Sequence, residues 1–166
     1  KFGAQVVSFA SLQGREDEPI IWRGPMLSNA IMEILEKTRW GSLDYLIADL
    51  PPGTSDVALT IMQILKPDGI IIVTTPQKAS IIDAKKSANM SKKLNVPVLG
   101  IIENMSGDIF GEGGGEKTAN ELDINFLGRL GLSREISHSN EGGHPFILDN
   151  DNKEFEDIVE TLKGAM

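Results

Sequence analysis

Three apolar runs, each rich in isoleucine, valine and leucine, constrain the fold of this chain more than any other feature. They cover residues 43–48, 69–74 and 96–102. A strand with one face in solvent alternates apolar and polar residues, whereas a strand buried on both faces of a parallel sheet is apolar almost throughout. The three runs therefore predict strands of a parallel sheet that is covered on both sides.

Segments whose apolar residues recur every three or four positions, the periodicity of a helix, lie before, between and after these runs. The predicted helices cover residues 26–38, 56–65, 80–94, 119–122 and 154–162. Strict alternation of strand and helix implies right-handed crossovers, and hence a doubly wound α/β fold with a mostly parallel sheet and helices on both faces. Residues 4–10 and 125–127 are candidate strands at the sheet edges. A chain of 166 residues without a linker or repeat is expected to be a single domain over 1–166.

The charge of the chain excludes several classes of partner. Its formal net charge is -8, whereas a nucleic-acid-binding protein normally presents a basic face, so we expect no nucleic acid partner. No window is apolar for long enough to span a bilayer, and the first residues lack an export signal, so we expect no membrane association and a cytoplasmic location. The chain opens with Lys1 rather than methionine, and we expect that further residues precede it in the natural protein.

The run at 43–48 ends in a carboxylate and a proline-rich turn, Asp49-Leu-Pro-Pro-Gly-Thr-Ser-Asp56. P-loop NTPases place an aspartate at the end of such a strand to hold Mg²⁺, so Asp49 is our candidate magnesium residue. Gly53 has no Cβ, so its amide can approach a terminal phosphate, and Thr54 and Asp56 are placed to order an attacking water. The alternative is an ordinary strand followed by a turn, which an apolar run and one aspartate alone would favour.

The longer string favours the functional interpretation because it resembles a family signature. Residues 49–56 are similar to the D-x-P-P-G-T-x-D motif of the Mrp/ApbC family of iron–sulfur cluster carrier ATPases, which belongs to the wider group that includes MinD and ParA. Other similar segments cover nearly the whole chain and weaken after residue 132. They are I-W-R-G-P-M at 21–26, W-G-S-L-D-Y at 40–45, T-T-P-Q at 74–77, N-V-P-V-L-G at 95–100 and E-N-M-S at 103–106.

The resemblance implies nucleotide-binding roles for several residues. It implies that Asn104 reads the adenine edge, a task that suits an amide because it offers both donors and an acceptor; without the family, a strand exit in left-handed geometry would explain Asn104 better. Arg23 would lie near the phosphates or at a subunit contact, with a solvated surface charge as the equal alternative. Pro76 and Gln77 would line the nucleotide-facing rim, unless they form an ordinary turn. Gly131 stands where the family often has a proline-containing turn against the base, which puts that contact in doubt.

The family's Gly-rich phosphate loop and its lysine should precede Lys1, so the chain alone is expected to bind nucleotide weakly and to be inactive as an ATPase. Residues 111–118, Gly-Glu-Gly-Gly-Gly-Glu-Lys-Thr, nearly match the phosphate-loop pattern G-x-x-x-x-G-K-[ST]. The match fails at Glu116, which replaces the glycine before the lysine, and no long strand runs directly into the segment. We interpret residues 111–115 as a flexible connection.

The chain contains no cysteine. The family usually carries a C-x-x-C pair shortly after E-N-M-S, and two subunits would pool these thiolates to hold one [4Fe-4S] cluster; here Gly107 is followed directly by Asp108. Either the cysteine loop exists in the natural protein and is missing from this chain, or the protein lacks it and holds no cluster by this route. We favour the first, because the residues on both sides keep the family pattern. His138 and His144 lie in a polar, Gly-rich stretch and are interpreted as surface residues.

The resemblance thus implies an ATP-binding and ATP-hydrolysing iron–sulfur cluster carrier or assembly protein. It would use ATP, Mg²⁺ and a [4Fe-4S] cluster, act as a homodimer and deliver the cluster to client proteins. The alternative is a MinD/ParA-like nucleotide-dependent regulatory switch without a metal cluster, and a C-x-x-C pair between Gly107 and Asp108 would decide between the two. A purely structural α/β fragment, the third hypothesis, would bind no nucleotide.

Overall fold

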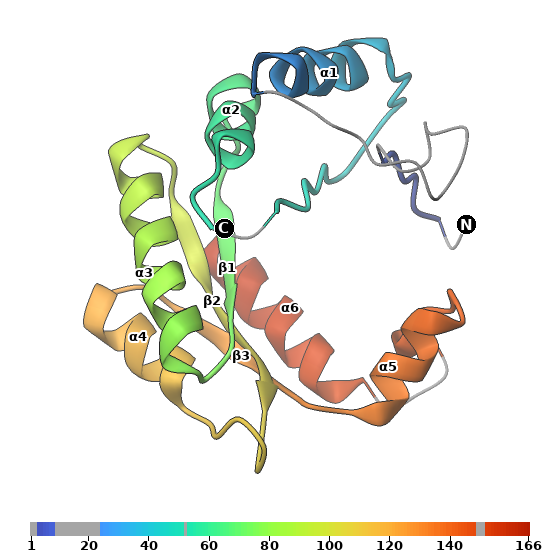
Figure 1. Cartoon of the computed structure of the whole chain (residues 1–166). Coiled ribbons are helices and arrows are strands. Elements are labelled where there is room, and N and C mark those ends of the chain that lie inside the picture. The colour runs from blue at the N-terminus through green and yellow to red at the C-terminus, as the bar shows by residue number, and fades with distance from the viewer. Residues whose placement is uncertain (1–2, 9–23, 52, 149–151) are drawn as a thin grey trace.

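A computed structural model describes residues 3–8, 24–51, 53–148 and 152–166 of the chain. Its centre is a three-stranded sheet in the order β1-β2-β3, in which both neighbouring pairs are parallel (Figure 1). The strands are β1 (Ile70–Thr74), β2 (Val98–Ser106) and β3 (Phe126–Gly131). The parallel sheet predicted from the continuous apolar runs is confirmed for the second and third runs.

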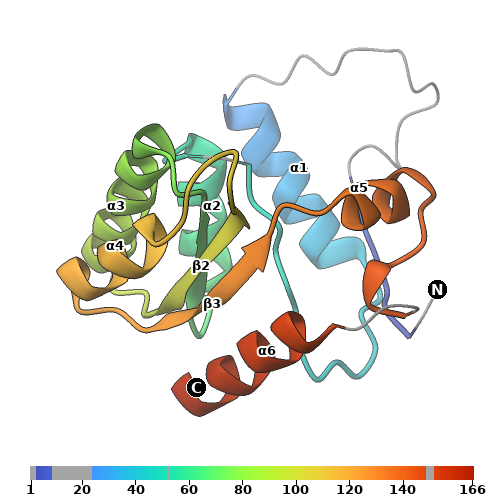
Figure 2. The same cartoon turned by 90° about the horizontal axis from the view of Figure 1, so that it is seen from below.

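Helices cover both faces of this sheet, as predicted. Helix α3 (Lys78–Lys93) connects β1 to β2 and α4 (Gly114–Leu122) connects β2 to β3, and the two helices lie side by side on one face. Helix α6 (Lys153–Ala165) packs on β3 and β2 from the other face (Figure 2). The strand–helix–strand connections therefore give the layered α/β architecture that alternating periodicity implies.

The main core lies between the sheet and the helices α3 and α4. Ile72 of β1 and Ile101 of β2 point toward these helices and meet three small residues, Ala84, Ala88 and Ala119. Ile101 and Ala119 are both 0% exposed. Alanine at the helix contacts lets the helix backbones approach the sheet closely, so the branched side chains of the strands fill the space between the layers.

On the opposite face a glycine of β3 allows helix α6 to approach. A Cβ at Gly128 would lie 2.5 Å from Cγ1 of Ile158 on α6, and the backbone of Gly128 has a φ of +151°. Ile158 is buried at this contact. Both the left-handed backbone and the lack of space therefore favour glycine at position 128.

Two further helices, α1 (Gly24–Lys37) and α2 (Asp56–Leu65), pack on each other above the sheet in Figure 1. The hydroxyl oxygens of Ser28 on α1 and Thr60 on α2 are 3.2 Å apart. Helix α2 begins after Ser55, whose Oγ accepts the backbone N–H of Ala58 at 3.4 Å, an N-cap of the usual kind. The helix predicted over residues 56–65 has the same bounds in the structure.

The strand predicted over residues 43–48 is wrong. This segment has no regular secondary structure, and its apolar side chains are exposed, with Ile47 at 88% and Tyr45 at 65%. A strand needs the N–H and C=O groups of a neighbouring strand, and in the part of the chain that the structure describes no strand pairs with these residues. The candidate edge strand at 4–10 also fails over residues 4–8, which form no strand, while residues 9 and 10 lie outside the described part. The candidate at 125–127 is confirmed, because it coincides with the start of β3.

Several boundaries differ from the predicted ones for identifiable reasons. Strand β2 runs to Ser106 rather than 102, and α4 begins at Gly114 rather than 119, because polar and glycine residues there hide the periodicity. Helix α5 (Arg134–Glu141) and the short 3-10 helix η2 (Phe146–Leu148) were not predicted. Helix α5 is polar and shows no apolar periodicity. Ser133 is nevertheless a signal for the start of the helix, because the Oγ of Ser133 accepts the N–H groups of Glu135 and Ile136.

Within the described residues, no helix combines the length and the apolar composition that crossing a membrane requires.

Candidate functional site

The carboxyl ends of the three parallel strands meet at one edge of the sheet. In open α/β sheets ligands bind at this edge. Thr74 at the end of β1 pairs with Glu103, and Ser106 at the end of β2 pairs with Gly131 at the end of β3. The structure therefore brings together four of the residues predicted from the sequence as nucleotide-binding. These are Pro76 and Gln77 after β1, Asn104 close to the end of β2, and Gly131 at the end of β3.

The turn after β1 is held by its own hydrogen bonds. The Oγ1 of buried Thr74 lies 2.9 Å from the Oγ of Ser80, and the same Ser80 oxygen accepts the N–H of Thr75 at 3.0 Å. Gln77 is the N-cap residue of α3, but its exposed side chain makes no capping hydrogen bond. The turn thus orders the backbone at Pro76 and leaves the Gln77 amide at the surface of the sheet edge.

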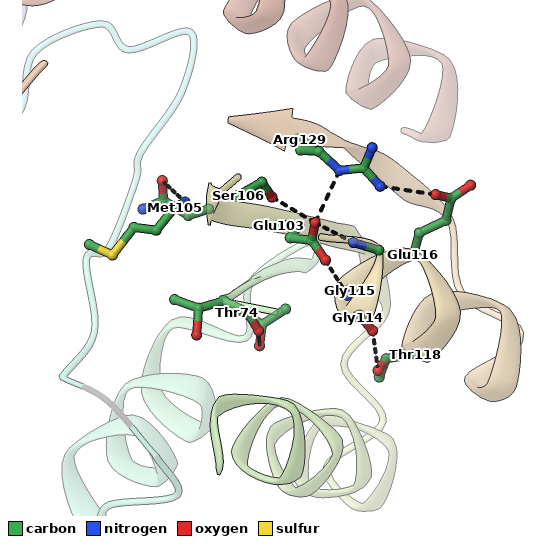
Figure 3. Close-up of polar contacts among 12 residues, drawn as sticks. Thr74, Glu103, Met105, Ser106, Gly114, Gly115, Glu116, Thr118 and Arg129 are labelled. Carbon is green, nitrogen blue, oxygen red and sulfur yellow. Dashed lines mark hydrogen bonds and ion pairs between the residues drawn. The ribbon is translucent and has the colours of Figure 1, made fainter. Parts of the chain in front are cut away.

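A buried carboxylate, Glu103, lies behind this edge and was not predicted. Glu103 is 0% exposed and accepts four hydrogen bonds (Figure 3). Its Oε1 receives the hydroxyl of Ser106 at 2.6 Å, the N–H of Gly113 at 2.9 Å and the Nε–H of Arg129 at 3.0 Å. Its Oε2 receives the N–H of Gly115 at 2.5 Å. These donors satisfy a charge that would otherwise be very unfavourable in the interior.

The pKa of Glu103 reflects two opposing effects. Burial raises the pKa of this carboxyl, but the hydrogen bonds from Ser106, Gly115, Gly113 and Arg129 together outweigh burial and hold the pKa below its ordinary value of 4.5. Arg129 also donates from Nη2 to Glu116 on α4 at 3.2 Å, and its guanidinium lies 5.8 Å from the ring centre of Phe126. Glu103 is therefore ionised at neutral pH and joins β2, β3 and α4.

The glycine-rich segment beside Glu103 is not a flexible connection, and that prediction is wrong. Gly114 and Gly115 form the first turn of α4, and a Cβ at Gly114 would lie 2.7 Å from the carbonyl oxygen of Pro76. A Cβ at Gly115 would lie 2.9 Å from the Cβ of Glu103. The glycines are needed for close approach of α4 to two strand ends.

The same contacts explain why residues 111–118 are no phosphate loop, as the sequence predicted. A phosphate loop binds anions with the free N–H groups at the start of a helix. Here the N–H groups of Gly113 and Gly115 already bind the Glu103 carboxylate. The anion position at this helix start is filled by the protein itself.

The turn between β2 and α4 is short and closed. Gly107 and Gly111 form an antiparallel bridge, with N···O distances of 3.0 and 2.7 Å between their backbones. The tip of the turn contains Asp108, Ile109 and Phe110, and Ile109 is 74% exposed. This turn stands where the family resemblance predicts the cysteine loop, and it closes without one.

Metal-binding side chains are not clustered in the part of the chain that the structure describes. No group of three or more His, Cys, Asp or Glu residues there is arranged to hold a metal ion. His138 on α5 and His144 after it are exposed, in agreement with the prediction that they are surface residues.

The residues of the D-x-P-P-G-T-x-D motif are arranged as a surface turn. Asp49 and Thr54 are exposed, and Asp56 is the exposed first residue of α2. Gly53 has a φ of +80° with open space around its Cβ position, so the glycine is required by the backbone rather than by packing. Asp49 does not lie at the tip of a strand, because residues 43–48 form none. Its magnesium role stays a prediction.

Two motif positions lie outside the described residues. Arg23, predicted near the phosphates or at a subunit contact, is one of them, and Pro52 is the other.

The sequence did offer one signal for the missed residues. Glu103 is a charged residue that directly follows the apolar run at residues 96–102, and a charge that is buried in such a segment requires a partner. Arg129 is the corresponding cation in the apolar run of β3. The identity of the partners follows only from the register that places the two residues opposite each other.

The fold and the polar edge define an α/β protein of the P-loop NTPase-like class. A family model described as "ParA: NUBPL iron-transfer P-loop NTPase" matches residues 1–166, and the chain belongs to this family.

Curated relatives agree with this assignment. The chain is 46% identical over 175 residues to the iron-sulfur cluster carrier protein of Methanocaldococcus jannaschii, a match that covers 98% of this chain and 60% of that protein. It is 43% identical to the iron-sulfur cluster carrier protein of Pyrococcus horikoshii, over 91% of this chain and 56% of that protein. The chain therefore spans less than two thirds of the length of these relatives. The alignment with the M. jannaschii protein covers 175 residues, more than the 166 residues of this chain. The aligned part of that protein therefore contains residues that this chain lacks.

Solved structures show the same fold. A nucleotide-binding protein of Archaeoglobus fulgidus in complex with ADP superposes with a TM-score of 0.68 at 34% identity, over 78% of this chain and 57% of that one. The cell division ATPase MinD of Pyrococcus furiosus superposes with a TM-score of 0.67 at 19% identity, over 87% of this chain and 60% of that one, which shows the fold alone.

The lowered pKa of Glu103 predicts a pH dependence of stability. Below pH 4.5 the unfolded chain binds a proton at this residue before the folded chain does, so the contribution of Glu103 is complete above pH 4.5 and is lost as the pH falls through the lower folded pKa. Glu103→Gln should lower the free energy of unfolding at pH 7 by about 2–4 kcal/mol and flatten this acid-side decline. Urea unfolding between pH 3 and pH 7 would measure both effects. Glu160→Gln, which changes an exposed carboxylate of α6, is the matched control and should change stability by less than about 0.5 kcal/mol.

Proposed function

We propose that this chain is part of an ATP-binding and ATP-hydrolysing iron–sulfur cluster carrier. It would be the part that contacts the nucleotide base and that carries the turn at residues 49–56, which faces the terminal phosphate. The observation that carries the proposal is the family match over the whole chain, together with relatives named as iron-sulfur cluster carrier proteins. The family is one of P-loop NTPases, which bind and hydrolyse nucleotides. We further propose that the protein works in the cytoplasm as a homodimer and passes its cluster to client proteins.

Nucleotide recognition is assigned to the edge where the three strands end. The A. fulgidus protein binds ADP and shares this fold at 34% identity, which supports a nucleotide at the corresponding edge here. Asn104 would read the adenine, with Gly131 at the end of the neighbouring strand and Pro76 and Gln77 at the rim. An amide side chain has the donors and the acceptor that discriminate one purine from another.

Magnesium and the terminal phosphate are assigned to the turn at residues 49–56. The exposed carboxylate of Asp49 fits a hydrated Mg²⁺, because hard cations prefer oxygen ligands and Mg²⁺ keeps several of its waters. The ion would neutralise charge on the phosphates during transfer. Gly53 would bring its N–H to the terminal phosphate, Thr54 and Asp56 would orient the attacking water, and Arg23 would contribute its charge near the phosphates or at a subunit contact.

The cluster, which is the cargo of a carrier, does not fit the residues of this chain. Thiolates are the usual ligands of a [4Fe-4S] cluster, and the chain has no cysteine. The closed turn from Gly107 to Gly111 occupies the place that the family resemblance assigns to the cysteine loop. A carrier function therefore requires cluster ligands from outside these 166 residues.

The same observation favours a second candidate function. A MinD/ParA-like nucleotide-dependent switch would use the edge where the three strands end and the turn at residues 49–56, but it needs no metal cluster. The lack of cysteines and the closed β2–α4 turn suit such a protein as they stand.

Cluster reconstitution with iron and sulfide separates the two functions. We expect no cluster to form at the β2–α4 turn, and we expect a Cys-x-x-Cys loop inserted between Gly107 and Asp108 to add the visible absorption of thiolate-bound iron. The matched control carries Ser-x-x-Ser in the same loop and should add none. Absorption in the protein without an insertion would support the carrier, with ligands beyond this chain, and its absence would support the switch.

Asp49→Ala tests the magnesium assignment. In the full-length protein we expect the variant to fold normally and to lose Mg²⁺-dependent ATP turnover by about a hundredfold or more, because the metal and its waters lose their anchor. Phosphate release measured at several Mg²⁺ concentrations would show this. Asp44→Ala removes another exposed carboxylate of the same segment and should leave turnover unchanged. Normal turnover in Asp49→Ala would remove Asp49 from this role.

Asn104→Ala tests the reading of the base. The variant should lower the affinity for ATP by about five- to tenfold, the loss expected for one or two hydrogen bonds, while the affinity for tripolyphosphate stays the same. Calorimetric titration of the full-length protein with both ligands gives the comparison. Asn120→Ala, on the exposed side of α4, is the control. Equal weakening of both ligands would show that the Asn104 amide does not contact the base.

A further inference from the structure

Strand β2 carries one extra residue close to its carboxyl end. The pairing of β2 with β3 passes from Glu103 opposite Arg129 to Ser106 opposite Gly131, so β2 advances by three residues where β3 advances by two. Such a bulge bends a strand and changes the direction of the side chains beside it, and bulges are frequent next to active sites. The extra residue falls at Asn104 and Met105, and we call these two residues the β2 bulge.

The backbone of the β2 bulge is strained. Met105 has a φ of +59°, in the left-handed region that residues with a Cβ disfavour. Its side chain is 41% exposed, so burial does not account for this conformation. The Oδ1 of Asn104 accepts the N–H of Met105 at 2.8 Å. This bond leaves the NH₂ group of Asn104 as the donor for a ligand, so the bulge determines which end of the amide a base meets.

Glu103 and Ser106 stand on either side of the β2 bulge and are joined across it. The Ser106 hydroxyl donates to the Glu103 carboxylate at 2.6 Å, and both residues are buried. The carboxylate is fixed in turn by the N–H groups of Gly113 and Gly115 on α4 and by Arg129 on β3, while Met105 points away from it (Figure 3). Strained backbone persists only where surrounding contacts over-determine it, and these contacts meet that requirement.

We propose that Glu103 is a positioning residue for nucleotide recognition. Its carboxylate fixes the backbone conformation of the β2 bulge through Ser106. That conformation presents the Asn104 amide at the sheet edge. The inference rests on the proposed function, in which Asn104 reads the adenine. Glu103 acts through Asn104, because its own side chain is directed at α4 and β3.

A merely structural role for Glu103 makes a different prediction. When a variant stays folded, a uniform loss of stability leaves the relative affinities for two ligands of the folded state unchanged. Loss of positioning lowers the affinity for ATP, which has a base, and leaves the affinity for tripolyphosphate, which has none, unchanged. The ratio of the two dissociation constants, tripolyphosphate over ATP, is therefore the informative quantity, and we call it the base preference.

The experiment measures the base preference of the full-length protein by calorimetric titration. Glu103→Gln keeps the shape of the side chain and removes the charge, and it should lower the base preference about tenfold, the effect of releasing one left-handed residue. Ser106→Ala removes only the bond across the bulge and should lower it about threefold. The second variant keeps the test available if Glu103→Gln does not fold.

Ser91→Ala is the matched control. Ser91 is 0% exposed and donates to the carbonyl of Val96 at 2.6 Å, just before β2 begins. The variant loses a buried hydrogen bond at the opposite end of the strand, so it should lower stability and leave the base preference within about twofold of the wild-type value.

A rescue variant separates strain from other effects of the substitution. Glycine adopts a left-handed backbone without penalty. Met105→Gly therefore removes the strain, and the bulge no longer needs the contacts of Glu103 to keep its conformation. Added to Glu103→Gln, it should return the base preference to within about threefold of the wild-type value.

The outcomes distinguish this inference from the proposed function. If Asn104→Ala lowers the base preference and neither Glu103→Gln nor Ser106→Ala does, the positioning role is overturned and the reading of the base stands. The positioning role is also overturned if Ser91→Ala lowers the base preference as much as Glu103→Gln. If the wild-type protein itself shows no base preference, both the inference and the base-reading assignment fall.

Discussion

The buried carboxylate of Glu103 is the constraint on which the arrangement of the candidate site depends. A charge that is 0% exposed must be met by donors from its surroundings, and here they come from β2, β3 and the start of α4. The requirement fixes the relative positions of three elements at the place where their loops meet. It also fills the anion position of the α4 helix, so the glycines there serve close packing rather than phosphate binding.

Much of the layered fold could be predicted from the sequence, because its information is local. The apolar runs that became β1 and β2 and the periodicity of α2, α3 and α6 are properties of short segments. Residues 43–48 show the limit of such information. Their pattern suits a buried strand, but a strand also needs a hydrogen-bonding neighbour, and no described strand supplies one. Local pattern gives the tendency of a segment, while pairing is a property of the whole sheet.

The candidate site also has a part that could be predicted from the sequence and a part that could not. The family resemblance singled out Asn104, Pro76, Gln77 and Gly131, and parallel strands that end on the same side of a sheet explain why these residues share one edge. The network behind them could not, since Glu103 and Arg129 are 26 residues apart in sequence and meet only through strand register. The β2 bulge is likewise invisible in composition. The residues that would touch a ligand were therefore easier to anticipate than those that hold them in place.

The outer edge of β1 has a consequence for how this chain behaves on its own. Strand β1 pairs with β2 on one side, and among the described residues no strand covers its other side. Ile71 and Val73 of the same strand are 39% and 60% exposed. Unpaired backbone groups beside exposed β-branched side chains form a template that recruits other extended segments, including those of neighbouring molecules. In a concentrated solution of the isolated chain, this edge is therefore the place where such pairing would begin.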